Sequence, residues 1–253
     1  MIPSIIHQTW KSRELSEPLA GYCSSWRRLN PDCEYRFYDD ARCTDFVRSE
    51  YPELAALYDS LPLAIMRADL FRYLVIHRIG GLYCDIDMEC LQPFDQFFKM
   101  SAAVFAIESR LTRKRQRELH YRQPYQIANS IFASEAGHPF LKAMIERAVA
   151  LIRARPRIST DMVEDITGPR CLTRLFYESR PARVHVLQRT YWQPYDYPRI
   201  YPFTKKMFAK HHALGSWKMP NARRSLFSSR RWIEMHVPPD PFPRRLFHDF
   251  AES

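Results

Sequence analysis

At residues 80–87 the chain reads Gly80-Gly81-Leu82-Tyr83-Cys84-Asp85-Ile86-Asp87. The preceding run from Leu63 to Ile79 contains neither glycine nor proline, so we expect a helix that ends with Gly80 as its C-cap. The apolar residues that come next predict a strand over residues 82–87. A helix, a glycine turn and a strand in this order are typical of an α/β domain.

The same alternation of short strands and helices continues on both sides of this segment. We expect further strands at residues 2–7, 34–38, 102–107 and 127–133, and further helices at residues 19–29, 40–51 and 139–153. This order predicts an α/β fold with a mainly parallel central sheet and with helical or irregular additions toward the C-terminus. The domain is expected to cover residues 1–219. Residues 220–253, which are basic and rich in proline, are expected to form a tail packed on it.

The overall composition is that of an ordinary globular protein, with 46% hydrophobic and 26% charged residues. These values exclude a disordered, collagen-like or disulfide-dense chain. Lys and Arg outnumber Asp and Glu by 38 to 28, which leaves a net charge of +10. Such an excess favours acidic partners, among them nucleotides, phosphorylated sugars, nucleic acid and anionic lipid.

The sequence predicts neither export nor a membrane span. The longest uninterrupted apolar run, Ala102 to Ile107, is far shorter than the ~20 residues of a spanning helix. Residues 1–6 lack the basic and apolar regions of a signal peptide, and the six cysteines form no CxxC pair. We therefore expect a cytoplasmic protein with reduced thiols, with peripheral contact at the inner membrane face left open. Three disulfides are the alternative for an exported chain.

Two pairs of charged residues stand out from this background. Asp85 and Asp87 lie two apart on the expected strand, so their carboxylates point the same way and repel each other unless a cation lies between them. Hard divalent ions such as Mg²⁺ or Mn²⁺ satisfy that need. Asp69 and Arg72 lie three apart on one face of the preceding helix, among apolar residues, which indicates the mouth of a site.

These residues lie within segments that resemble glycosyltransferase family 32, in order over residues 2–217. The family includes yeast-type initiating α-1,6-mannosyltransferases, and its DXD core is shared with the clostridial glucosylating toxins. The matching segments are Ile2-Pro3-Ser4-Ile5-Ile6-His7-Gln8-Thr9-Trp10, Arg67-Ala68-Asp69-Leu70-Phe71-Arg72-Tyr73, residues 80–87, Asn129-Ser130-Ile131-Phe132-Ala133-Ser134, Gly137-His138-Pro139, Thr167-Gly168-Pro169 and His211-His212-Ala213-Leu214-Gly215-Ser216-Trp217.

The resemblance implies a GT-A-type, single Rossmann-like domain, a nucleotide-sugar donor and a divalent metal, Mn²⁺ or Mg²⁺. It implies that Trp10 stacks on the base, that Asp69 and Arg72 hold the donor sugar, and that Asp87 binds the metal. Carried over position by position, it assigns catalytic roles to Asp69, Arg72, Asp85 and Asp87, donor binding to Trp10, Tyr83, Asn129, Ser216 and Trp217, and metal binding to Asp87 and His212. His211 is the alternative metal ligand.

The expected function is a retaining transfer of a hexose from a UDP- or GDP-sugar to a glycan, lipid-linked or protein acceptor. Front-side attack is favoured over double displacement, for which Glu164 and Asp165 are acidic candidates. The alternative is a basic module that binds nucleic acid or a membrane surface without transferase activity. No nucleic-acid-binding motif accompanies the charge, so nucleic acid is not expected as a partner. We expect Arg113, Lys114, Arg115 and Arg117 to serve the acceptor or a membrane surface.

Overall fold

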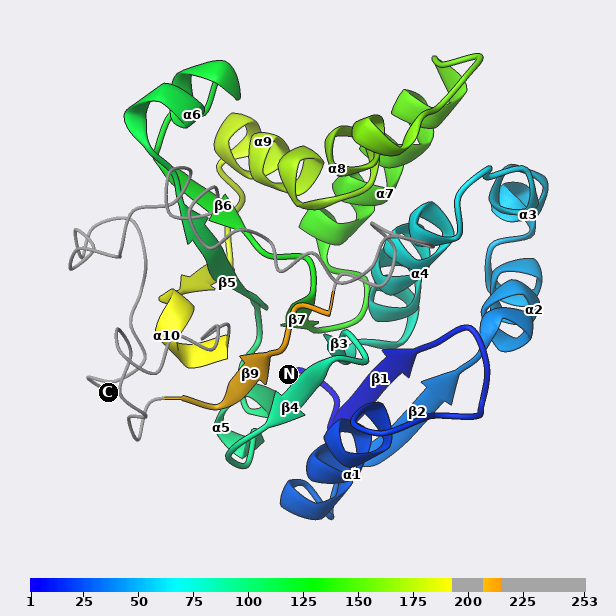
Figure 1. The fold of residues 1–253 in the computed structure, drawn as a ribbon, viewed down its shortest axis with the longest axis vertical. Helices are drawn as coiled ribbons and strands as arrows, with labels where there is room; N and C mark the ends of the chain where they lie inside the picture. Colours follow the sequence, from blue (N-terminus) through cyan, green and yellow to red (C-terminus); the bar gives the residue numbers. More distant parts are fainter. Residues whose placement is uncertain (193–206, 215–253) are drawn as a thin grey trace.

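A computed structural model describes residues 1–192 and 207–214 of the chain (Figure 1). The predicted tail at 220–253, together with Ser216 and Trp217, lies outside the described residues. The strands are β1 Ile5–Thr9, β2 Glu34–Tyr38, β3 Gly81–Cys84, β4 Met88–Cys90, β5 Ala103–Arg110, β6 Tyr125–Ile127, β7 Ile131–Ser134, β8 Val184–Leu187 and β9 Ala209–His211.

The helices alternate with these strands in the first part of the chain and follow one another more often later. They are α1 Leu19–Leu29, α2 Asp40–Glu50, α3 Pro52–Asp59, α4 Ala64–Ile79, α5 Asp95–Phe98, α6 Arg113–Glu118, α7 Pro139–Arg153, α8 Val163–Ile166, α9 Pro169–Ser179 and α10 Arg189–Trp192, with a short 3₁₀ turn at Thr160–Met162. Among the helices that the structure describes, none has the length and apolar character to cross a membrane.

The central sheet has seven strands in the order β2-β1-β3-β7-β5-β6, with β8 paired to β5. β1 is parallel to both β2 and β3, and β8 is parallel to β5. β7 runs antiparallel to both of its neighbours, and β6 runs antiparallel to β5. The sheet is therefore mixed but mainly parallel in strand direction, which confirms the predicted fold class. A separate ribbon pairs β4 with β9 (Figure 1).

Apolar side chains cover both faces of the central sheet. On one face, Tyr83 and Phe105 pack with the buried sides of α2, α3, α4, α7 and α9. On the other face, Leu82 packs with Trp26 of α1, with Phe94, and with Trp192 of α10. Successive residues of β3 thus enter opposite cores, as the period of two in a strand requires. Because both faces are buried, the edge at which the strands end is the part of the sheet left for binding.

The sharp connection from α4 into β3 depends on two glycines. Gly80 and Gly81 have φ angles of 78° and 106°, in the region that favours glycine. A Cβ on Gly80 would lie 2.7 Å from the Pro3 ring, and one on Gly81 would lie 2.5 Å from the Ile5 carbonyl oxygen. The pair therefore allows the chain to leave the helix and enter the sheet directly beside β1.

The helices follow the sequence expectation closely, whereas several strands differ. The strands expected at 2–7 and 102–107 are Ile5–Thr9 and Ala103–Arg110, and the one expected at 127–133 is two strands, Tyr125–Ile127 and Ile131–Ser134. The helix at 19–29, the strand at 34–38 and the helix at 139–153 have the predicted bounds. The strand expected over 82–87 ends at Cys84, because the Asp85 N–H bonds to the Ser130 carbonyl and the Met88 N–H then closes a turn onto the Asp85 carbonyl. Asp85 and Asp87 consequently lie on the turn between β3 and β4.

Candidate functional site

A cavity of about 670 Å³ lies at the carboxyl ends of β1 and β3. Thr9 and Trp10 line it at the end of β1, and Asp85 and Asp87 line it after β3. The carboxyl edge of parallel strands is where α/β proteins commonly bind ligands. The apolar residues of β3 stop at Cys84, so the polar side chains that follow face this cavity instead of a core.

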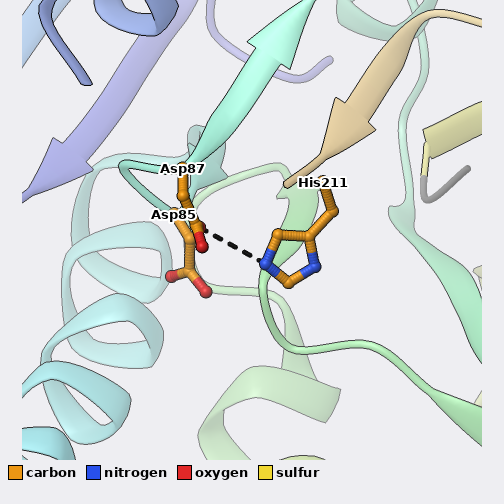
Figure 2. Close-up of side chains that lie close together, drawn as sticks. All are labelled: Asp85, Asp87 and His211. Carbon is orange, nitrogen blue, oxygen red and sulfur yellow. Dashed lines mark ion pairs between the residues drawn. The ribbon is translucent and has the colours of Figure 1, made fainter. Parts of the chain in front are cut away.

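Three side chains converge in the cavity as a possible metal site. Potential ligand atoms of Asp85, Asp87 and His211 all lie within 4.8 Å of one another, and the His211 Nε2 is 3.3 Å from the Asp87 Oδ1 (Figure 2). His211 reaches the two aspartates because β9 pairs with β4 in a register that sets His211 opposite Met88. Residues far apart in the sequence are thus joined by one short ribbon.

The ionisable groups of this cluster shift one another's pKa values. Burial by itself raises the pKa of Asp87, but hydrogen bonds from His211 and from the Leu214 N–H outweigh burial and hold that pKa below its ordinary value. Burial raises the pKa of Asp85 against the opposing Arg72 guanidinium. Burial tends to lower the pKa of His211, yet the carboxylates of Asp87, Asp85 and Glu108 together raise it. The cluster therefore favours a positive charge at its centre.

This donor set suits a divalent cation. Two carboxylates and one imidazole offer oxygen and nitrogen ligands within the reach of one ion. The Asp85 Oδ1 is engaged by the Tyr83 hydroxyl and by Arg72, whereas no hydrogen bond among the described residues involves its Oδ2. A cation would bind the imidazole of His211 in its neutral form and would balance the two carboxylates. The residues present therefore fit the metal that the resemblance implies.

The two neighbouring histidines have different positions from those expected. His212 was assigned to the metal, but its Nε2 lies 2.9 Å from the Glu89 Oε2 and its ring stacks on Tyr22 with centroids 4.1 Å apart. His211, the alternative, takes the place beside Asp87. The geometry therefore favours His211, the alternative, over His212 as the metal ligand. In an extended segment adjacent residues face opposite sides, so only one of the two can point into the cluster.

Asp69 and Arg72 form a buried polar network on α4 rather than an exposed ion pair. The Arg72 Nη2 lies 3.1 Å from the Asp69 Oδ1, and the Arg72 Nη1 lies 3.2 Å from the Asp85 Oδ1. Asn129 and Thr167 donate hydrogen bonds of 3.0 Å to the two Asp69 oxygens. Burial raises the pKa of Asp69 to about 6. Arg72 is thus fixed between two carboxylates at the cavity wall.

The remaining predicted donor-binding residues lie around the same cavity where the structure describes them. Trp10 is partly exposed and lines the cavity beside Lys11. The Tyr83 hydroxyl donates to the Asp85 Oδ1 at 2.9 Å and lies 3.1 Å from the Thr9 hydroxyl. Asn129 lines the cavity and bonds to Asp69. Their roles toward a donor remain predictions.

Sequence reasoning did not single out several residues that the structure brings to the site. Thr167 holds Asp69, and its only signal was the Thr167-Gly168-Pro169 segment of the resemblance. Glu108 lies on β5 and had no signal beyond its charge. The four basic residues expected to serve the acceptor or a membrane lie on helix α6, which the Thr112 hydroxyl caps. Arg115 lines the cavity, whereas Arg113, Lys114 and Arg117 are exposed.

Comparison with solved structures identifies the class of fold. The chain superposes on PaToxG Glycosyltransferase with a TM-score of 0.53 and 18% identity, covering 70% of each chain. It superposes on the ligand-free glycosyltransferase domain from the YGT toxin with a TM-score of 0.51 and 10% identity, covering 73% of this chain and 80% of that one. The fold is therefore the GT-A fold of glycosyltransferases.

Comparison of the amino-acid sequence shows which proteins the chain is similar to. Residues 16–103 match the family described as "Glycosyltransferase sugar-binding region containing DXD motif". Inositol phosphoceramide mannosyltransferase 3 of Schizosaccharomyces pombe is 35% identical over 144 residues, 57% of this chain and 36% of that protein. Initiation-specific alpha-1,6-mannosyltransferase of Candida albicans is 28% identical over 170 residues, 60% of this chain and 44% of that protein.

These findings confirm the resemblance to glycosyltransferase family 32 and to a toxin glycosyltransferase core. The match to the first three curated relatives spans only 36% to 40% of their length.

Proposed function

We propose that this chain is a metal-dependent glycosyltransferase that transfers a hexose, with mannose as the first candidate, from a nucleotide sugar to a hydroxyl acceptor. The observation that carries the proposal is the cluster of Asp85, Asp87 and His211 in the wall of a cavity that Trp10 and Arg72 also line. Mannose is preferred because the similar curated proteins from yeasts are named as mannosyltransferases.

Each group of the cavity has a function in such a reaction. Asp87, Asp85 and His211 would hold Mn²⁺ or Mg²⁺, which supplies charge neutralisation for a diphosphate leaving group. Trp10 offers an aromatic face to the base, a contact worth roughly 1–3 kcal/mol. Asp69 and Asp85 keep Arg72 in one orientation, so its charge is in place before the donor binds.

The stereochemistry proposed is retention at the anomeric carbon. Front-side attack needs no protein carboxylate bonded to the sugar. Glu164 and Asp165 were the acidic candidates for double displacement, and both are held by arginines. Glu164 lies 3.0 Å from Arg170, and Asp165 lies 2.6 Å from Arg174. This engagement favours the front-side route. Proton NMR of the first product formed distinguishes retention from inversion.

The acceptor proposed is a glycan or a lipid-linked sugar or polyol. A lipid-linked polyol is the first candidate, because the similar protein from Schizosaccharomyces pombe is named for inositol phosphoceramide. The exposed Arg113, Lys114 and Arg117 on α6 would add attraction to anionic lipid of about 1 kcal/mol per residue close to the surface. The alternative of a basic binding module is not favoured, since net charge accounts for neither the metal cluster nor the cavity.

A donor panel tests the proposal. The protein is incubated with GDP-mannose, UDP-glucose, UDP-galactose and UDP-N-acetylglucosamine in Mn²⁺, and released GDP or UDP is measured. We expect slow release from one donor, highest for GDP-mannose, that EDTA abolishes and Mn²⁺ restores. Calorimetric titration with GDP and UDP accompanies it. Absence of release from every donor, together with absence of nucleotide binding, would overturn the proposed function.

A further inference from the structure

Strand β5 contains an irregularity at the point where it meets the cavity. In its antiparallel pairing with β6, Ile107 lies opposite Ile127, whereas Ser109 lies opposite Gln126. Two steps along β5 thus correspond to one step along β6, which leaves Glu108 as the extra residue of a β-bulge. In a regular strand Glu108 and Ser109 would face opposite sides of the sheet. Here both line the cavity.

The bulge presents two kinds of polar group in a fixed arrangement. The Glu108 Oε2 accepts a hydrogen bond of 2.7 Å from the Gln126 Nε2, and the Gln126 Oε1 accepts one of 3.2 Å from the Tyr121 hydroxyl. Tyr121 is buried, so this chain of bonds orients the Glu108 carboxylate from the protein side.

The hydroxyl of Ser109 is a second feature of the bulge, independent of Glu108. It is 1% exposed, and its Oγ has no hydrogen-bond partner among the described residues. An unsatisfied buried hydroxyl costs free energy, so most buried polar atoms are paired. A hydroxyl left unpaired in a cavity wall, next to an oriented carboxylate, indicates a ligand that offers hydroxyl groups.

The sheet order separates this subsite from the rest of the cavity. Trp10 follows β1, the two aspartates follow β3, and the bulge lies on β5, which β7 separates from β3. Figure 1 shows β5 and β6 on the opposite side of β3 from β1. A ligand in contact with both Trp10 and the metal cluster would therefore extend from β1 toward the middle of the cavity, leaving the bulge for a second molecule.

We propose that the bulge at Glu108 and Ser109 is the subsite for a neutral polyol acceptor, a sugar or cyclitol ring. The inference rests on the proposed function and names the acceptor class of that site. Glu108 accepts a hydrogen bond from the hydroxyl that receives the sugar, and Ser109 bonds to a neighbouring hydroxyl. Leu111 and Leu119, which also line the cavity, offer contact for the CH groups of the ring. Two arginines of the lining are already paired, Arg115 with Glu118 and Arg170 with Glu164 and Asp165, so neither requires a charged ligand.

Binding of two small polyols tests the subsite directly. The probes are methyl α-D-mannopyranoside and myo-inositol, observed by saturation-transfer NMR on the protein with GDP and Mg²⁺. We expect E108Q to weaken probe binding by about tenfold to a hundredfold, as for loss of a hydrogen bond to a charged group. S109A is expected to weaken it by about threefold to tenfold. The matched control is E146Q, because Glu146 is an exposed carboxylate of α7 paired with Lys142 and outside the cavity lining.

The affinities for nucleotide and metal distinguish a failure of the acceptor subsite from a failure of the proposed function. We expect GDP and Mn²⁺ to bind E108Q, S109A and E146Q as they bind the wild type. Equal probe binding by E108Q and wild type, or no binding of either polyol to the wild type, would overturn the acceptor subsite. A parallel loss of GDP affinity in E108Q would place Glu108 at the donor and also overturn it. The proposed function fails separately, when the wild type neither binds nucleotide nor releases it from any donor.

Discussion

The α4 wall of the cavity and the turn between β3 and β4 each contribute a critical aspartate, but the two carboxylates have opposite surroundings. Asp69 on α4 accepts hydrogen bonds from Asn129 and Thr167 and pairs with Arg72, and its side chain is 5% exposed. Asp87 on the turn is paired with His211, and its side chain is 14% exposed. The first carboxylate is enclosed by groups of its own core, and the second lies at the end of a ribbon.

The different surroundings of Asp69 and Asp87 suit different roles: one carboxylate can fix neighbouring side chains in place, and the other can bind a ligand. A carboxylate whose oxygens are already satisfied by buried donors fixes those donors in place, and here it fixes Arg72. A carboxylate on a turn, whose partner is a titratable imidazole, can exchange that partner's proton for a cation. The resemblance assigned both residues to the donor site, whereas the geometry favours a positioning role for Asp69 and a ligand role for Asp87.

The largest expected effect follows from Asp87→Asn. The amide keeps the size of the side chain but removes the charge that holds a cation, so metal-dependent turnover should fall by about a hundredfold to a thousandfold, as for loss of one electrostatic group at a reacting centre. Turnover of the best donor in Mn²⁺ measures it, and circular dichroism controls for the fold. Near wild-type turnover in this variant would remove Asp87 from the metal site.

The adjacent histidines give the next comparison. His211→Ala should weaken Mn²⁺ binding by about tenfold to a hundredfold, whereas His212→Ala, which loses only the Glu89 and Tyr22 contacts, should weaken it less than His211→Ala. Titration with Mn²⁺ by electron paramagnetic resonance, without nucleotide, measures both. A larger loss in His212→Ala than in His211→Ala would restore the assignment made from the sequence.

Stability should respond in the opposite order to metal binding. Asp69→Ala leaves Arg72, Asn129 and Thr167 without a buried partner, so the free energy of unfolding should fall by about 3 kcal/mol. Asp87→Ala removes a more exposed group and should cost about 1 kcal/mol. Urea unfolding of the two variants tests this ranking. Equal losses would contradict the separation of a supporting wall from a ligand-binding turn.

Nucleotide affinity should depend on a residue outside both regions. Trp10→Ala removes the aromatic face at the end of β1 and should weaken binding of GDP or UDP by roughly 1–3 kcal/mol. Calorimetric titration measures the change, and Mn²⁺ affinity without nucleotide serves as the control because Trp10 is outside the metal cluster. Unchanged affinity for both nucleotides would identify Trp10 as a packing residue only.

The last and most gradual effect is a pH dependence of stability. Burial raises the pKa of Asp69 from 3.8 to about 6, so between these values the folded chain binds a proton that the unfolded chain has released. The free energy of unfolding should therefore decrease as the pH rises from about 4 to about 6, by up to about 3 kcal/mol from this group. Asp69→Asn should remove this part of the dependence. Parallel pH profiles for the two proteins would show that another group is responsible.

The ends of helices could be predicted from the sequence where they depend only on neighbouring residues. Asn30-Pro31 ends α1, Asp39 caps α2, and Gly80 ends α4, so the bounds of these helices could be predicted from neighbouring residues alone. Asp85 and Asp87 could be named from their spacing, although they lie on a turn and not on the strand.

Features that depend on long-range register could not be predicted. The choice between His211 and His212 follows from the pairing of β9 with β4, and periodicity within residues 207–214 does not determine which side faces the cluster. Both Glu108 and Ser109 line the cavity because of a bulge in β5, and no residue in the sequence marks that bulge. Thr167 reaches Asp69 through the packing of α8 and α9, which sequence spacing does not reveal.

The candidate metal site forms only when β9 pairs with β4, and these two strands come from distant parts of the chain. Glu89 and His212 are 123 residues apart in the chain, so the two aspartates exist long before their histidine during synthesis. Closing such a long loop has an entropic cost, which bound ligands can offset by binding the closed form. A cation at this site could therefore bind all three side chains only after β9 has paired with β4. Once bound, it would stabilise that pairing, so metal binding would mark a late step in the folding of the domain.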